Sequence, residues 1–295
     1  MEDILPELPE LAVYCERLQE ALGGARLSGV ALHDPFVLRT VDPAPDAMLG
    51  RELVRAWHRS KFLLLEWDGG TLWAFHLMLG GRLHLKTTDK FRPHRGRTKF
   101  SADFSNDVVL EMTEAGKKRR ASLHVLTDVA ELARIDRGVE PLAADFTEER
   151  LATLLRQQNR QLKKALRDPE LLAGIGNAYS DEILFEAGLS PLRLTGRLED
   201  DEINRLHAAI VGTLHAWIAR VRERCPEGLP VKQDGWRRDM AVHGRTGEPC
   251  PRCGTAIERI SYRDSETNYC PSCQNDGRVL ADRRRSRLGI QRRPR

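Results

Sequence analysis

The sequence predicts an α+β protein of several domains: an N-terminal β-sandwich with flanking helices, then a helical domain, and finally a β-hairpin that carries cysteines. Three observations support this prediction. Short strand-like runs follow a single helix in the first 140 residues, helical spacing takes over near Pro141, and paired cysteines appear after Glu248.

The first predicted helix begins near Leu8. Apolar side chains recur at helical spacing from Leu8 to Leu22, and Pro9 suits a first helical turn. Gly23 and Gly24 then end the pattern. Cys15 falls within this helix and is expected to be a buried thiol, as is Cys225 in a later helical pattern.

Strand-like runs fill most of the next hundred residues. The runs at 62–67 and 71–76 flank Asp68-Gly69-Gly70, which predicts a hairpin. The segments 108–113 and 121–126 flank another turn-like stretch, so we interpret them as a second hairpin. Several short strands behind one helix favour a β-sandwich.

Helical patterns dominate after Pro141. Asp145 and Glu148 have the spacing of a capping box before the apolar run at Leu151, and helical spacing continues through 210–221. Two glycines interrupt this domain at 174–177. We predict four parts of the chain: 1–140 (β-sandwich), 141–235 (helical), 236–278 (cysteine-bearing hairpin) and 279–295 (basic tail).

Composition and charge exclude several classes of protein. Of the 295 residues 41% are hydrophobic and 31% charged, no run of about 18 apolar residues exists, and the N-terminus resembles no secretion signal. We therefore expect a cytoplasmic protein with no membrane partner. Eight arginines follow Cys273, and a second basic stretch covers 82–120; both suit phosphates, although a solvated, disordered tail explains the arginines equally well.

Four cysteines predict a metal site. Cys250, Cys253, Cys270 and Cys273 form two Cys-x2-Cys pairs, and two such pairs supply the four thiolates of a closed zinc site. A closed site has no open coordination position, so we predict one structural Zn²⁺ and a C-terminal zinc finger. Disulfides are the alternative, and they are rare in the cytosol.

Residues 258–269 alternate like a β-hairpin between the two cysteine pairs. Arg259 and Arg263 would then face phosphates, or they are ordinary surface charges.

Four motifs in order resemble the bacterial formamidopyrimidine-DNA glycosylase and endonuclease VIII family (Fpg/Nei, MutM-like). They are Pro6-Glu7-Leu8-Pro9-Glu10, Lys61-Phe62-Leu63-Leu64-Leu65, Gly174-Ile175-Gly176-Asn177-Ala178-Tyr179 and His243-Gly244-Arg245-Thr246-Gly247-Glu248-Pro249-Cys250. The resemblance implies a base-excision enzyme that binds double-stranded DNA with damaged bases or abasic sites. It also implies a helix-two-turns-helix element in the helical domain and a nucleoid-associated bacterial protein; we expect a monomer.

The resemblance assigns roles to two residues at the start of the chain. An uncharged amine attacks C1′ of the damaged nucleotide, a Schiff base forms, and β/δ-elimination cleaves the backbone. This nucleophile maps onto Pro6, and the acid that protonates the sugar ring oxygen maps onto Glu7. A helix start alone would account for the prolines and would not require Glu7.

Further residues acquire roles in DNA binding from the same resemblance. Lys61 is expected at the phosphate beside the lesion, or it is a strand lysine whose stem lies on apolar surface. Asn177 is expected at a phosphate near a helix start, or it is a simple N-cap. Leu79 lies near the void-filling position, although Leu79 and Met78 would serve equally well in the core.

Three departures from the family pattern bear on activity. Pro6 is not the first residue as written, so either translation starts at position 5 and exposes Pro6, or the chain is a non-catalytic relative or one that uses another amine. No wedge motif is evident between Val108 and Leu126. Ser265 stands where a zinc-finger arginine is expected, with Arg263 two residues earlier.

Three functions follow in order of preference: a DNA glycosylase/AP lyase, a DNA-binding module that does not cut, and an unrelated zinc-ribbon protein of RNA metabolism or translation. The specificity for 8-oxoguanine, formamidopyrimidines, oxidised pyrimidines or abasic sites stays open.

Overall fold

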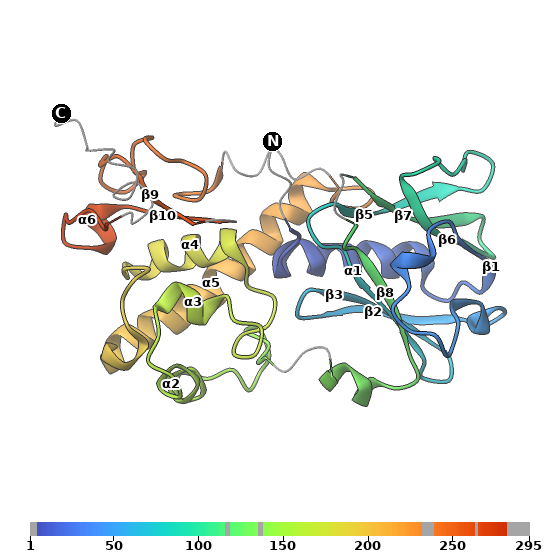
Figure 1. Ribbon diagram of the computed structural model, residues 1–295, viewed down its shortest axis with the longest axis horizontal. Coiled ribbons are helices and arrows are strands. Elements are labelled where there is room, and N and C mark those ends of the chain that lie inside the picture. The colour runs from blue at the N-terminus through green and yellow to red at the C-terminus, as the bar shows by residue number, and fades with distance from the viewer. Residues whose placement is uncertain (1–4, 116–118, 135–137, 232–238, 263–264, 282–295) are drawn as a thin grey trace. The chain divides into compact units, whose positions relative to one another are not determined.

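The computed structural model of the protein describes residues 5–115, 119–134, 138–231, 239–262 and 265–281 (Figure 1). The chain divides into two compact units. The first comprises residues 1–138 and 216–232, and the second comprises residues 139–215 and 233–295.

Two four-stranded antiparallel sheets form the β-sandwich of the first unit. One sheet has the order β1-β6-β7-β5, formed by Leu27–Leu32, Thr98–Phe104, Val108–Glu114 and Gly81–Thr87. The other has the order β2-β3-β4-β8, formed by Leu53–Arg59, Phe62–Trp67, Leu72–His76 and Ser122–Leu126. Alternate side chains of both sheets meet in one core, where the rings of Trp73 and Phe100 lie 5.2 Å apart.

Helix α1 (Leu8–Leu22) packs into this same core with the apolar face that its spacing predicts, and Gly23 ends it. It runs antiparallel to β2. The Gly24 N–H just after the helix donates to the Leu53 carbonyl (2.9 Å), and one turn earlier the Gln19 amide oxygen accepts from the Ala56 N–H (2.7 Å). The C-terminal end of α1 therefore lies beside the first half of the edge strand β2, from Leu53 to Ala56.

The hairpin around Asp68 is confirmed, because β3 and β4 pair from Phe62–His76 to Glu66–Leu72. The second predicted hairpin is wrong. Strand β7 pairs with β5 on one side and β6 on the other, whereas β8 pairs with β4 in the opposite sheet. Both edges of β7 are already occupied, so β8 adds to the free edge of β4.

Short 3₁₀ helices complete the first unit: η1 (Pro35–Val37), η2 (Pro45–Met48) and η3 (Val129–Arg134). Leu132 of η3 covers a small second apolar cluster on the outer face of the β2-β3-β4-β8 sheet.

The second unit is helical and carries the cysteine hairpin. Its helices are α2 (Glu148–Arg156), α3 (Leu162–Leu166), α4 (Asn177–Ala187), η4 (Thr195–Arg197) and the part of α5 (Asp200–Arg224) that precedes residue 216. The hairpin strands β9 (Glu258–Ser261) and β10 (Glu266–Tyr269) are antiparallel, and the short helix α6 (Pro271–Gln274) follows. Within the described part of the chain, no helix is both long and apolar enough to cross a membrane.

The predicted cap of α2 needs correction. Thr147, and not Asp145, is the N-cap, and its hydroxyl accepts from the Arg150 N–H (3.2 Å). Asp145 forms an ion pair with the Arg150 side chain instead. The helix begins at Glu148, so the third helical position holds Arg150 and not the glutamate of a capping box.

Candidate functional site

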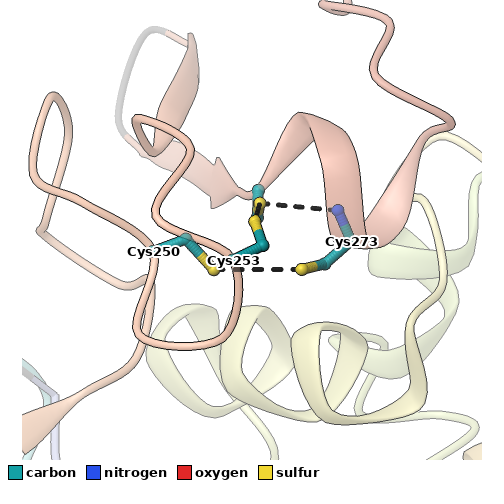
Figure 2. Close-up of side chains that lie close together, drawn as sticks. Cys250, Cys253 and Cys273 are labelled. Carbon is teal, nitrogen blue, oxygen red and sulfur yellow. Dashed lines mark hydrogen bonds between the residues drawn. The ribbon is translucent and has the colours of Figure 1, made fainter.

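The four cysteines of the second unit converge on one point. Their sulfur atoms all lie within 4.8 Å of one another, with Cys250 and Cys273 at 3.9 Å and Cys253 and Cys270 at 3.4 Å. A tetrahedral zinc with Zn–S bonds of about 2.3 Å requires sulfurs about 3.8 Å apart. These separations fit zinc and are far too long for disulfide bonds. Figure 2 shows Cys250 and Cys273 facing each other.

The pKa values of these thiols shift in different directions within the cluster. Hydrogen bonding to Thr255 lowers the pKa of Cys253 to about 6, whereas burial raises the pKa of Cys270 and of Cys273. The backbone N–H groups of Arg252 and Cys273 donate to the sulfurs of Cys250 and Cys270 (3.4 and 3.5 Å). A bound Zn²⁺ is the charge that would let all four thiols ionise together.

The finger packs directly on helix α4. Phe185 lies in an apolar cluster with Cys250 and Cys270, and the Arg252 guanidinium stands 4.4 Å above its ring. Gln274 accepts from the Cys270 N–H (2.8 Å) and donates to the Leu189 carbonyl (3.0 Å). The metal site is therefore joined to the end of α4 by both apolar and polar contacts.

A buried ionic network joins the finger to the middle of α4. The Asp181 carboxylate is fully buried, and it accepts from the Lys163 ammonium (2.6 Å) and the Asn268 N–H (3.2 Å). Its second oxygen also meets His243 Nδ1 at 2.9 Å. Lys163 in turn donates to the Glu266 carbonyl of β10 (3.0 Å). One carboxylate thus ties α3, α4 and the hairpin together.

The neighbouring carboxylate, Glu182, holds the chain that enters the finger. It accepts from three successive backbone N–H groups, those of residues 241–243, at 2.7 to 3.0 Å. Burial raises the pKa of Glu182, and these hydrogen bonds oppose the shift. Asn268 continues the network, because its side chain accepts from Gly244 N–H (2.9 Å) and donates to Thr246 (3.0 Å).

Asn177 is the first residue of α4. Gly176 occupies the N-cap position, so the alternative that Asn177 is a simple N-cap is wrong. Gly174 has φ +76, a conformation that favours glycine, and it turns the chain into the helix. Asn177 Oδ1 is buried and has no hydrogen-bond partner among the described residues. The positive end of α4 and an amide with spare bonding capacity are thus together at this turn.

Pro6 and Glu7 lie buried immediately before α1. Glu7 is the N-cap, and it forms a reciprocal capping box with Glu10, whose carboxylate accepts from the Glu7 N–H at 2.8 Å. The helix start therefore does use Glu7, which corrects the expectation that a structural role would not require it. Only 2% of Glu7 and 3% of Glu10 are exposed, an unusual degree of burial for carboxylates.

Lys61 lies in the turn between β2 and β3, just before the strand and not within it. Glu7 precedes Gln19 by twelve residues, and Lys61 follows Ala56 by five. These separations correspond to about 18 Å of helix and about 17 Å of strand. Because α1 and β2 run antiparallel and Gln19 contacts Ala56, we infer that Glu7 and Lys61 lie toward the same end of the sandwich.

His76 lies near Lys61 and was not singled out from the sequence. Burial, assisted by the nearby charge of Lys61, lowers the pKa of His76 to about 4, so the imidazole is neutral at neutral pH. Its Nδ1 accepts from the Met78 N–H (3.2 Å), which leaves the proton on Nε2 as a donor. A neutral donor next to the Lys61 ammonium suits an anionic ligand. His76 stands three residues before Leu79 in the segment His76-Leu77-Met78-Leu79, and this proximity was the available signal.

Leu79 lies at the tip of the connection between β4 and β5, and 54% of it is exposed. The core alternative is therefore wrong for Leu79. Met78 has φ +51, and the Gly81 N–H donates to the Leu77 carbonyl (2.8 Å), which closes a tight turn. Leu77 is buried and Leu79 is presented outward.

The structure does not describe several residues that the sequence singled out. These are Arg263, the arginines from 283 to 295, and Lys117 and Lys118 of the stretch in which no wedge motif is evident. Arg259 forms an ion pair with Glu266 in the same hairpin (3.5 Å). Cys15 is buried in α1, whereas Cys225 follows α5 and is only half-buried.

Comparison with known proteins places these features in one family. The formamidopyrimidine-DNA glycosylase N-terminal domain matches residues 5–121, the H2TH domain of the same proteins matches 137–224, and the zinc finger found in FPG and IleRS matches 247–275. The chain is 35% identical to the formamidopyrimidine-DNA glycosylase of Chloroflexus aurantiacus, with 92% of this chain and 98% of that protein covered. The chain belongs to the formamidopyrimidine-DNA glycosylase family. It is thus a DNA glycosylase/AP lyase of base-excision repair.

Other members of the family show the same extent of similarity. The formamidopyrimidine-DNA glycosylase of Thermus thermophilus is 34% identical, and the match covers 92% of this chain and all of that protein. The Lactococcus lactis Fpg in complex with DNA containing an abasic site superposes with a TM-score of 0.80 at 26% identity, covering 91% of this chain and 99% of that one. The Thermus thermophilus MutM structure gives a TM-score of 0.77 at 28% identity, covering 93% of this chain and all of that one.

The family finger and the cysteine geometry agree on one structural zinc, held by Cys250, Cys253, Cys270 and Cys273. Within this family fold, sequence reasoning identified the cysteines and the turn at Asn177. It missed the buried Asp181 network, because an Asp in the middle of a helix gives no sign of the Lys163 that meets it from another helix.

Proposed function

We propose that this family member excises damaged bases from double-stranded DNA through the amine of Pro6 and then cleaves the strand. The observation that carries the proposal is the buried Pro6–Glu7 pair at the start of α1. The family match begins at residue 5, directly before Pro6. The named activity of the relatives makes formamidopyrimidines the first substrate to test.

The chemistry requires Pro6 as a secondary amine. Its nitrogen forms a bond to C1′ as the glycosidic bond breaks and the base leaves with a proton. Glu7 protonates the sugar ring oxygen, the ring opens, and a Schiff base results. Loss of a C2′ proton expels the 3′ phosphate, and a second elimination expels the 5′ phosphate. Water finally releases the sugar fragment from Pro6.

Pro6 can do this only where no residue precedes it, because within a chain its nitrogen is a tertiary amide. We propose that translation starts at the codon for Leu5, which is then read as methionine. Removal of this initiator methionine exposes Pro6. An α-amine has a pKa of about 7.7–8.0, so a useful fraction is uncharged near neutral pH. If residues before Pro6 are retained in the cell, the enzyme must use another amine.

The remaining roles concern DNA binding. In the proposal Lys61, assisted by His76, binds the phosphate beside the lesion, and Asn177 binds a phosphate at the start of α4. Leu79 fills the space that the damaged nucleotide vacates. Arg263 of the finger hairpin contacts the opposite side of the duplex or its backbone.

The proposed organisation follows from these roles. Residues 1–140 form the catalytic sandwich, 141–235 the helix-two-turns-helix domain, 236–278 the zinc finger and 279–295 a basic tail. The protein acts as a monomer on the nucleoid in the bacterial cytoplasm.

Borohydride trapping on abasic-site DNA tests the proposal. Protein that begins at Pro6 should form a covalent adduct, and protein that retains Met1 should form little or none, because only the first has the free proline amine. Absence of an adduct with the Pro6 form would refute the lyase mechanism. Intact-mass measurement of the native protein then shows whether Pro6 is the first residue, since a retained Met1 would contradict the role of Pro6.

A further inference from the structure

Arg82 fixes the loop that presents Leu79. Its Nη1 donates to the Leu79 carbonyl (2.9 Å) and to the Gly81 carbonyl (2.6 Å), and its Nε donates to the Val231 carbonyl (3.3 Å). We propose that Arg82 is a positioning residue for base excision, which holds Leu79 ready to enter the duplex. This inference rests on the proposed function.

The acceptors belong to two segments that are far apart in sequence. Leu79 lies in the β4–β5 connection and Gly81 begins β5, whereas Val231 follows α5 by seven residues. The segment with Val231 is itself anchored, because Leu229 packs against the sandwich core and its carbonyl accepts from the Val231 N–H (2.8 Å). Arg82 therefore ties the Leu79 turn to a second, independently held piece of backbone.

An arginine suits this task better than other side chains. The guanidinium stays charged at all relevant pH values and offers several N–H donors in a planar fork, so one side chain reaches three carbonyls. Arg82 is half-buried at the base of the turn. Its charge also opposes the rise that burial causes in the pKa of Tyr14, which indicates that it lies close to α1 as well.

The turn needs such support because the Leu79 side chain packs little against the rest of the protein. With 54% of its surface exposed, Leu79 gains no fixed position from the core. Extruding a stacked base is energetically unfavourable, and a residue that fills the vacated space contributes only if its backbone holds its position. Arg82 thus links Leu79 to the backbone that follows α5 within the same compact unit.

Two measurements on Arg82→Met test the proposal with full-length protein starting at Pro6. Single-turnover excision of a formamidopyrimidine from duplex DNA should fall about 10- to 100-fold. Cleavage of a preformed abasic site should change by no more than about twofold, because the cost of extrusion is least where the base is already missing. Arg82→Lys keeps the charge without the fork and should restore excision in part.

The second measurement does not need catalysis. A 2-aminopurine placed beside the lesion in the duplex should brighten when the wild-type protein binds and inserts Leu79. That increase should be lost in Arg82→Met and in Leu79→Ala. The double variant should lose no more than either single variant, because both remove the same event.

Arg26→Met is the matched control. Arg26 also donates to a backbone carbonyl of the first unit (Gly50, 3.0 Å), but it is distant in sequence from the Leu79 turn, and its hydrogen bonds within the described residues do not involve that turn. It should leave both measurements unchanged. Equal losses of excision and abasic cleavage in Arg82→Met, or an unchanged fluorescence increase, would overturn the positioning role. Failure of the wild-type protein to form a borohydride adduct would instead refute the proposed function, and the fluorescence would still test Arg82.

Discussion

Glu7 and Glu10 are two buried carboxylates with the same structural task. Each accepts a backbone hydrogen bond of the capping box at the start of α1, and both are almost completely shielded from solvent. Only Glu7 adjoins Pro6, so only Glu7 has a chemical task in the proposed mechanism. The pair offers a way to separate structure from catalysis at single residues.

We expect Glu7→Gln to lower base excision by about 10²- to 10⁴-fold, the usual contribution of a general acid. Glu10→Gln should cost a similar amount of stability, within about 0.5–2 kcal/mol, and leave excision nearly intact. Single-turnover kinetics and urea unfolding of both variants provide the check. Equal kinetic losses in the two variants would mean that Glu7 acts only through the helix cap.

At the scale of elements, the zinc finger and α4 form one structural body. Cys270→Ser should abolish stoichiometric zinc and weaken the binding of abasic-site DNA at least about tenfold, because closure of the site and folding of the hairpin are coupled. Metal analysis and a binding titration measure the two effects. The control is Cys225→Ser, which changes a half-buried thiol outside the cluster and should retain one zinc per chain.

The Asp181 network makes a second prediction at this scale. Asp181→Ala leaves the buried Lys163 ammonium without its carboxylate, which should cost about 3–5 kcal/mol in the free energy of unfolding. Asp201→Ala breaks the exposed Arg205 pair on α5 and should cost less than about 1 kcal/mol. Denaturant titrations in which the release of zinc is monitored would measure the change in the free energy of unfolding for both variants. Comparable small losses would show that the buried pair adds no more than an exposed one.

For the whole molecule, two buried histidines shape the dependence of stability on pH. Burial lowers the pKa of His58 and of His76 to about 4, below the ordinary value near 6.5. Between these values the unfolded chain binds more protons than the folded one. The free energy of unfolding is therefore highest above about pH 6.5 and decreases as the pH falls toward 4.

We therefore expect the urea concentration at the unfolding midpoint to decrease when the pH is lowered from 7 to 5. The decrease should be smaller in His58→Gln. This variant is suited to the test because His58 has no place in the proposed DNA site. Fluorescence-detected unfolding at the two pH values measures the difference. Parallel pH profiles for wild type and variant would contradict a role for His58.

The sequence predicted local structure well where the signal is periodic. The spacing from Leu8 to Leu22, the Asp68-Gly69-Gly70 turn and the hairpin at 258–269 all formed as expected. It failed where the partner of a segment is remote: β7 and β8 look like a hairpin but pair with different sheets. Strand pairing depends on which edges are free, and a local pattern does not contain that information.

By itself, the sequence determined the fold class, the four zinc ligands and the family motifs, because helical and strand periodicity and Cys-x2-Cys spacing are local properties of the chain. The tertiary structure alone decided the outward position of Leu79, the three carbonyls held by Arg82 and the meeting of Asp181 with Lys163. The contacts of Arg82 with Val231 and of Asp181 with Lys163 join separate elements, and the exposure of Leu79 depends on what packs around its turn, so all three follow from how whole elements pack around a core.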